Sequence, residues 1–227
     1  MAIEIRSVPE GAGVVAVALV KGSAAAIARG DDEGDAGDRA LMLAADGAGL
    51  ASFLRPRRPT ATETYRNYLE WHGVVGPGCG FAFGELVRAG SPRHVEPPRE
   101  LWAAMVPTLA TAHRLRAVMV DAGARGLYVA AAYRPEGGEI GSRHKRNAAL
   151  DLDLLPGDER LAGRYLAAAS GLLRSYGAAL RLGVGTYHPA SVKATRRVHI
   201  DAGTRAPTAC WQKHDGRYVE PPAVAGM

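Results

Sequence analysis

The sequence predicts an α+β domain: a small, largely antiparallel sheet with flanking helices, preceded by an N-terminal extension with short strands. Three observations predict this class. The second half of the chain contains two long runs with helical periodicity, four short runs with strand character, and Gly or Pro residues between them. A chain of 227 residues with 47% apolar and 22% charged residues is long enough, and ordinary enough in composition, to bury a sizeable core.

The helices are expected in three places. A long helix is expected over Pro107–Ala122, because Pro suits a first helical turn and a Gly follows directly after the last position. Apolar residues recur at helical spacing over Leu161–Tyr176, and Gly177 is expected to end that helix. Residues 62–71 are expected to form a short helix.

The strands are expected from apolar runs and alternation. Residues 127–133 (LYVAAAY) form an apolar run that Pro135 stops, which is typical of a buried strand. Residues 149–155 alternate in polarity and place Asp151 and Asp153 on one face. The other expected strands cover residues 181–185, 197–202 and, as two short strands, 3–20.

Composition and breaks in the pattern set the outline of the chain. Three prolines within residues 91–98 predict a boundary there, which gives an N-terminal extension (1–95) of unknown role, a domain (96–215) and a C-terminal tail (216–227). The sequence has no apolar run of 18 residues and no recognisable export signal, so no membrane span is expected and the localisation stays open. Cys79 and Cys210 could form one bridge or stay as two buried thiols.

Two short segments contain residue types that bind metal ions. His144 precedes Asp151 by seven residues, which is long enough for a loop to turn into a strand and bring both side chains to one centre. His199, from a separate strand, supplies a third ligand. Two imidazoles and one carboxylate with an open fourth position are the ligand set of a catalytic zinc ion, whose bound water has a pKa near neutrality.

The residues around these ligands resemble a known family. The pattern Ser142-x-His-x-x-Asn-x-Ala-x-Asp151 is similar to the S-x-H-x-x-G-x-A-x-D signature of the zinc D-alanyl-D-alanine carboxypeptidases and murein endopeptidases, relatives of the lysostaphin-type and hedgehog-type zinc folds. Residues 132–135 (AYRP) resemble that family's S-G-Y-R-S strand end. Residues 183–187 (GVGTY) and 198–211, from VHIDAG to Trp211, resemble the murein-endopeptidase branch. The resemblance covers about residues 100–211, with all its elements in order.

The resemblance implies roles for individual residues. His144, Asp151 and His199 would be the zinc ligands, at one end of the sheet. Arg134 would hold the scissile carbonyl oxygen or a substrate carboxylate, because a planar cation can stabilise a developing oxyanion. Peptidoglycan or its peptide fragments would be the partner.

Two positions depart from the family pattern. Asn147 stands where the family has Gly, and Asn is the least costly substitute if that position needs a positive φ. The carboxypeptidase branch places a Glu, its general base, three residues before the last zinc His. Arg196 stands there and cannot accept a proton at neutral pH. Asp201, on the same strand face as His199, is either the base or a group that orients His199, and Asp153 is a weaker candidate for either role.

Further residues are expected to contact substrate. Tyr187 offers a phenolic donor to the oxyanion, and His188 follows it directly at a strand end. Ser142, which opens the first motif, is assigned to substrate binding as well. Basic residues flank both motifs and would attract an anionic substrate if they ring one cleft, or else form a solvated rim: Arg143, Lys145, Arg146, Lys193, Arg196 and Arg197.

The expected function is therefore a zinc metallopeptidase, a peptidoglycan endopeptidase or D,D-carboxypeptidase, that hydrolyses D-amino-acid-containing peptides with metal-activated water. It would act on the cell wall, in the periplasm, outside the cell, or after release by a phage. One alternative is a non-catalytic zinc domain of the same fold that binds peptidoglycan or a protein partner. The other, a basic nucleic-acid-binding protein, is not favoured, because only 6% of the residues are aromatic and no binding motif accompanies the net charge of +5.

Overall fold

The computed structural model describes residues 3–10, 13–20, 23–30, 56–76, 81–136, 141–188, 197–203, 209–214 and 217–219. The chain divides into two compact units, Met1–Arg55 and Pro56–Met227. Among the described residues, no helix is both long enough and apolar enough to cross a membrane.

The first unit contains a three-stranded antiparallel sheet in the order β1-β2-β3. Its strands are β1 (Ile3–Glu10), β2 (Gly13–Val20) and β3 (Ser23–Gly30). The two strands expected over residues 3–20 are present. The third was missed because it reads SAAAIARG, and Ala is depleted in strands.

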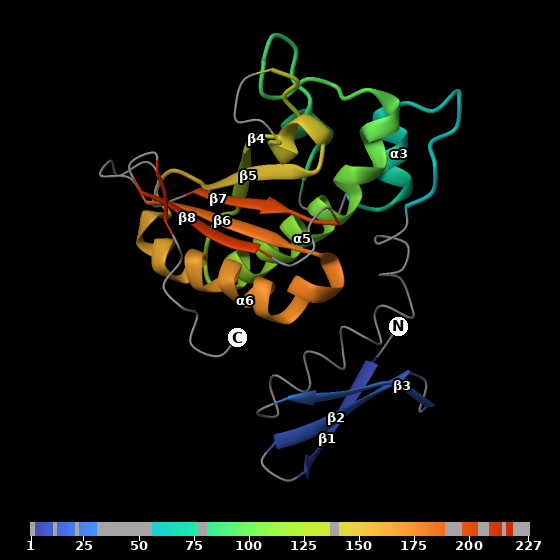
Figure 1. Cartoon of the computed structure of the whole chain (residues 1–227), viewed down its shortest axis with the longest axis vertical. Coiled ribbons are helices and arrows are strands. Elements are labelled where there is room, and N and C mark those ends of the chain that lie inside the picture. The colour runs from blue at the N-terminus through green and yellow to red at the C-terminus, as the bar shows by residue number, and fades with distance from the viewer. Residues whose placement is uncertain are drawn as a thin grey trace. The chain divides into compact units, whose positions relative to one another are not determined.

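The second unit is built on a six-stranded sheet in the order β4-β5-β7-β6-β8-β9 (Figure 1). Its neighbouring strands are antiparallel except for the parallel pair β6 and β8, so the prediction of an α+β fold with a largely antiparallel sheet is confirmed. The strands are β4 (Leu127–Ala131), β5 (Ala149–Leu154), β6 (Gly183–His188), β7 (Arg197–Asp201), β8 (Ala209–His214) and β9 (Arg217–Val219).

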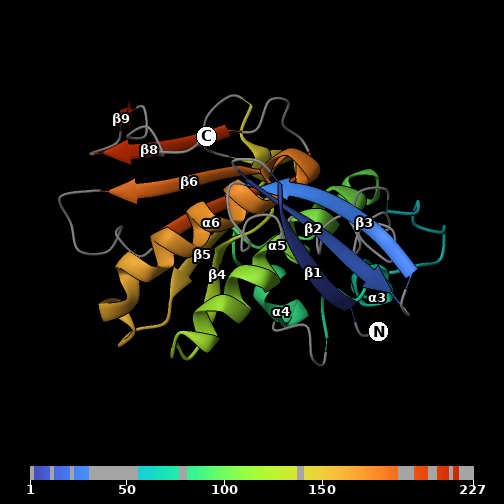
Figure 2. The ribbon, with the colours of Figure 1, turned by 90° about the horizontal axis from the view of Figure 1, so that it is seen from below.

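Two long helices, α5 (Trp102–Asp121) and α6 (Ala162–Leu180), lie across one face of this sheet (Figure 2). Leu150 and Leu152 of β5 and Ile200 of β7 are 0% exposed and contribute to the core. Because side chains alternate along a strand, Asp151 and His199 point to the opposite face. The short helices are α3 (Tyr65–Trp71), α4 (Phe83–Leu86), η2 (Arg99–Leu101), η3 (Arg143–Arg146) and η4 (Glu159–Leu161).

Both long helices extend beyond their predicted bounds. Helix α5 begins at Trp102, and Pro107 lies inside it, so the predicted start is wrong because Pro was placed in the first turn. Helix α6 continues past Gly177 to Leu180. A Gly inside a helix costs only about 1 kcal/mol relative to Ala, which packing of the helix can offset.

The predicted boundary at residues 95/96 is wrong, because the second unit begins at Pro56. The proline-rich stretch is tied to the end of β4 by two hydrogen bonds, from the Ala132 N–H to the Arg93 carbonyl and from the Val95 N–H to the Tyr133 carbonyl. At the other end, β9 lies within the predicted tail and pairs with β8. Cys210 is a free thiol in β8, and Cys79 lies outside the described residues.

Candidate metal centre

Four residues form a row across the sheet next to the candidate metal centre. Asp151 of β5 pairs with His199 of β7, which pairs with Gly185 of β6, which pairs with Trp211 of β8. Laterally paired residues project from the same face of a sheet. The strand register therefore places the carboxylate beside one imidazole, and the indole on the far side of that imidazole.

The second imidazole comes from the turn before β5. His144 lies in the short helix η3, and the C-cap residue that follows this helix, Asn147, is in the left-handed conformation (φ 51°). The His144 Nδ1–H donates to the Ala132 carbonyl at 2.7 Å. Because a carbonyl only accepts, Nδ1 carries the proton, and in the neutral ring the lone pair lies on Nε2.

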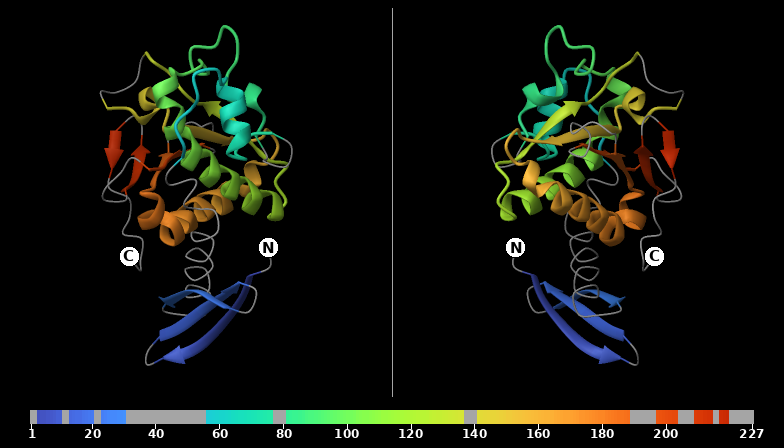
Figure 3. Two further views of the ribbon diagram at one scale, coloured as in Figure 1. Left: turned by 90° about the vertical axis from the view of Figure 1, so that its right-hand side faces the viewer. Right: turned by 90° about the vertical axis from the view of Figure 1, so that its left-hand side faces the viewer.

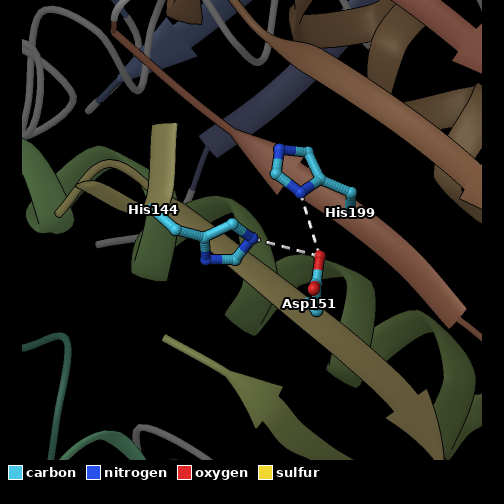
Figure 4. A group of neighbouring side chains, drawn as sticks. All are labelled: His144, Asp151 and His199. Carbon is cyan, nitrogen blue, oxygen red and sulfur yellow. Dashed lines mark hydrogen bonds and ion pairs between the residues drawn. The ribbon is translucent and has the colours of Figure 1, made fainter. Parts of the chain in front are cut away.

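The three side chains converge on one oxygen atom (Figure 4). Oδ1 of Asp151 lies 3.3 Å from His144 Nε2 and 2.9 Å from His199 Nδ1. One ligand atom from each residue lies within 4.8 Å of the others, and all three side chains are buried. The three residues predicted as ligands thus come together and form a group that could hold a metal ion.

The chemistry of the donor atoms fits a metal ion. Among the described residues, the buried Nε2 of His144 has no hydrogen-bond partner, and a buried polar atom of this kind calls for a partner. Two imidazole nitrogens and a carboxylate oxygen suit zinc and also other divalent transition metals.

Burial and hydrogen bonding act in opposite directions on the ligands. Burial would raise the pKa of Asp151, but its interactions with the two imidazoles, His144 and His199, outweigh burial and hold that pKa well below its ordinary value. Burial would lower the pKa of His199, but hydrogen bonds to Asp151 and Asp201 raise it to about 9. Asp151 is therefore ionised at neutral pH, as a metal ligand must be.

Asp201 contacts the other ring nitrogen of His199. Its Oδ2 lies 3.2 Å from His199 Nε2, and the residue is 0% exposed. The carboxylate is thus on the side of the ring opposite the nitrogen that faces Asp151. Of the two roles considered for Asp201, this contact favours orientation of His199, because carboxylates commonly fix metal-bound imidazoles in this way.

Asp153 belongs to an ion pair. Arg197 donates to its carboxylate from Nε at 2.8 Å and from Nη2 at 2.7 Å, and the Tyr128 hydroxyl donates to Oδ2 at 2.9 Å. These three bonds occupy the Asp153 carboxylate. The two that come from Arg197 also remove this guanidinium from the basic rim that would attract substrate.

The other predicted site residues lie on segments next to those that hold the ligands, because β4 pairs with β5 and β6 pairs with β7. Arg134 follows the end of β4, two residues after the carbonyl that His144 contacts, and its buried Nε has no hydrogen-bond partner in the part of the chain that the structure describes. Ser142 is half-buried and precedes η3, without a side-chain cap. Tyr187 of β6 meets the Trp211 ring edge-on, with centroids 5.5 Å apart. His188 ends β6, and its side chain lies outside the described residues.

Two supporting residues, Thr108 and Tyr65, were missed by sequence reasoning, as was the contact between Gly185 and Trp211, although both of these stand in the matched motifs. The Thr108 hydroxyl donates to the Ala148 carbonyl at 2.8 Å and accepts from the Ala202 N–H at 3.2 Å, which ties α5 to the start of β5 and the end of β7. A Cβ on Gly185 would lie 2.0 Å from Trp211 Cζ2, so the indole covers the glycine. A Thr on an apolar helix face was the available signal for Thr108.

The remaining supporting residue is Tyr65, whose ring is 1% exposed and whose hydroxyl contacts the Asn147 side chain. Two histidines outside the metal centre are also buried. His94 is 5% exposed, with its ring between the Ser91 hydroxyl and the Val129 carbonyl. His72 is 8% exposed.

Comparison of the chain with models of protein families, with curated proteins and with solved structures finds no match.

Proposed function

We propose that the protein is a zinc-dependent hydrolase of peptide bonds in peptidoglycan stem or cross-link peptides. One observation carries the proposal: His144, Asp151 and His199 converge within 4.8 Å in a buried site, and no described residue forms a hydrogen bond with Nε2 of His144. The same three residues occupy the zinc-ligand positions of the murein endopeptidases that the sequence resembles.

Zinc bound to these residues would lower the pKa of a coordinated water toward neutrality and polarise a substrate carbonyl. Hydrogen bonds within the protein orient both imidazole ligands for metal binding. The Ala132 carbonyl holds the His144 Nδ1–H, so that Nε2 faces the other ligands. Asp201 holds His199 Nε2, so that Nδ1 faces Asp151. Each imidazole thus has one nitrogen fixed by the protein and one directed to the centre.

Arg134 is proposed to bind the scissile carbonyl oxygen or a substrate carboxylate. Its buried Nε has no partner among the described residues, which leaves a donor for a ligand. Tyr187, His188 and Ser142 are proposed to contact the peptide. Peptidoglycan stems carry free carboxylates, and Arg143, Lys145 and Arg146 on η3 supply positive charge beside His144. A hydrolase of this kind would act at the cell wall.

A non-catalytic zinc domain that binds peptidoglycan is the second candidate. It is favoured by one observation: Arg196 stands where the carboxypeptidase branch has its proton-accepting Glu. The nearest carboxylates, Asp201 and Asp153, are engaged with His199 and Arg197.

Digestion of purified peptidoglycan distinguishes the two candidates. The full chain is incubated with peptidoglycan and zinc, released fragments are identified by mass spectrometry, and bound metal is measured on the same preparation. The hydrolase predicts about one zinc per chain and released fragments, both lost in His144→Ala. Stoichiometric zinc without fragments would favour the binding domain, and a chain that takes up no zinc would contradict both.

A further inference from the structure

Asn147 connects two of the candidate ligands along the chain. It lies three residues after His144 and four before Asp151. Its N–H donates to the His144 carbonyl at 3.2 Å, and its backbone is left-handed, with φ 51° and ψ 37°. Asn accepts this conformation at little cost, so the backbone alone does not require a side-chain anchor.

The Asn147 side chain is nevertheless fully buried and hydrogen-bonded. Its amide Nδ2 donates to the Leu101 carbonyl at 3.0 Å and to the Tyr65 hydroxyl at 3.1 Å, and that hydroxyl lies 3.4 Å from Oδ1. The turn that carries His144 is therefore tied to two segments that precede it in sequence by more than forty residues.

Tyr65 is itself held in place. It is the first residue of α3, and its ring packs against Trp102 and Phe83, with centroids 5.4 Å and 5.8 Å away. Helix α3 lies beside the N-terminal part of α5, which begins at Trp102 (Figure 3). A buried hydroxyl on a packed ring is a fixed point, because the ring has little freedom to follow the turn if the turn moves.

We propose that Tyr65 and Asn147 are positioning residues for the metal centre: helix α3 holds, through this pair, the turn that aims His144 Nε2 at Asp151. The inference rests on the metal-binding part of the proposed function and not on hydrolysis. It assigns a role to residues 56–76, which precede every segment that resembles the family.

Three single substitutions distinguish a positioning role of Tyr65 and Asn147 from an effect on the stability of the fold. Asn147→Gly keeps the left-handed backbone and removes the amide. Tyr65→Phe removes only the hydroxyl and keeps the ring packing. Tyr68→Phe is the matched control, because Tyr68 is also buried in α3 and its hydroxyl donates at 2.7 Å to Arg57, away from η3.

Zinc affinity is measured by competition with a chromophoric chelator, alongside thermal unfolding and the visible spectrum of the cobalt-loaded chain. We expect Asn147→Gly and Tyr65→Phe each to weaken zinc binding about tenfold, the lower end of the effect of groups that orient metal ligands. The double variant should bind zinc no more weakly than Asn147→Gly alone, because that substitution already removes the contact that Tyr65→Phe breaks. The cobalt spectrum should change in both.

Tyr68→Phe should unfold at a lower temperature and bind zinc as the wild type does. The inference is overturned if Tyr65→Phe, which is expected to fold, binds zinc with unchanged affinity and an unchanged cobalt spectrum. It is also overturned if Tyr68→Phe weakens binding as much. A wild-type chain that binds zinc but releases no peptidoglycan fragments would remove the proposed hydrolase and leave this inference standing. A wild-type chain that binds no zinc would remove both.

Discussion

The contact between His199 and Asp201 predicts how metal affinity depends on pH. The pKa of His199 is raised from 6.5 to about 9, so its proton is fully held below pH 6.5 and is lost as the pH rises through 9. A metal ion that binds Nδ1 at pH 7 must displace this proton. The apparent affinity for the metal ion should therefore be about 100-fold lower at pH 7 than at pH 9, which is tenfold for each pH unit. Apparent zinc affinity should therefore rise about tenfold per pH unit above pH 7 and level off near pH 9.

Asp201→Asn changes this profile in two ways. The variant keeps an oxygen that can accept from His199 Nε2, now 3.2 Å from the carboxylate, but removes one of the two charges that raise the pKa of that ring. The plateau should therefore begin at a lower pH. The limiting affinity above pH 9 should fall about 10- to 100-fold, the usual effect of losing a carboxylate that orients a metal-bound imidazole.

Chelator competition from pH 6.5 to 9.5 measures both quantities. Asp158→Asn is the matched control, because Asp158 is a buried carboxylate that accepts from the Arg125 N–H at 2.9 Å, outside the metal centre. The reasoning is refuted if Asp201→Asn has the plateau and the limiting affinity of the wild type. If zinc binding is unchanged but peptidoglycan hydrolysis falls by about 10² to 10⁴, Asp201 is the proton acceptor instead.

Three further predictions concern the surroundings of the site. Thr108→Val should lower the free energy of unfolding by roughly 2 to 4 kcal/mol in urea titrations, because it leaves two buried backbone groups without a partner. Thr111→Val, whose hydroxyl donates to a carbonyl of its own helix, should lower it less. Equal losses in the two variants would contradict the role of Thr108 in tying α5 to β5 and β7. Burial lowers the pKa of His94, so the wild type should lose stability as the pH falls below about 6.5, by up to about 1.4 kcal/mol per unit; in His94→Asn this loss should shrink. Gly185→Ala should displace the Trp211 indole, since the new Cβ would lie 2.0 Å from it. The change in tryptophan emission on cobalt binding should therefore differ between this variant and the wild type, and an equal change would contradict the packing.

The sequence is sufficient to predict the parts of the fold that depend on local patterns. The alternation of residues 149–155 predicts β5, observed over Ala149–Leu154, and places Asp151 on the face where it is found. His144 and His199 are predicted as ligands from their residue types and spacing, and the structure brings them together with Asp151 in a group that could hold a metal ion.

The parts that could not be predicted depend on pairing between distant residues. Asp153 and Arg197 are 44 positions apart, and Tyr65 and Asn147 are 82 positions apart. A local pattern carries no signal for such contacts, so Asp153 remained a candidate base. The domain boundary predicted at the prolines of residues 91–98 fails for the same reason, because the backbone pairing of this stretch with the end of β4 is a tertiary contact.

Gly185 and Trp211 also restrict the order in which the sequence of this protein can change. The indole occupies the space that any side chain at position 185 would need, so only one of the two positions can hold a large residue. If Gly185 is substituted while the indole remains, the new side chain clashes with it. If Trp211 is substituted first, the cavity that it leaves can later be filled by a larger residue at position 185. A lineage that replaces this glycine is therefore expected to have lost the tryptophan beforehand, and with it the aromatic neighbour of His199.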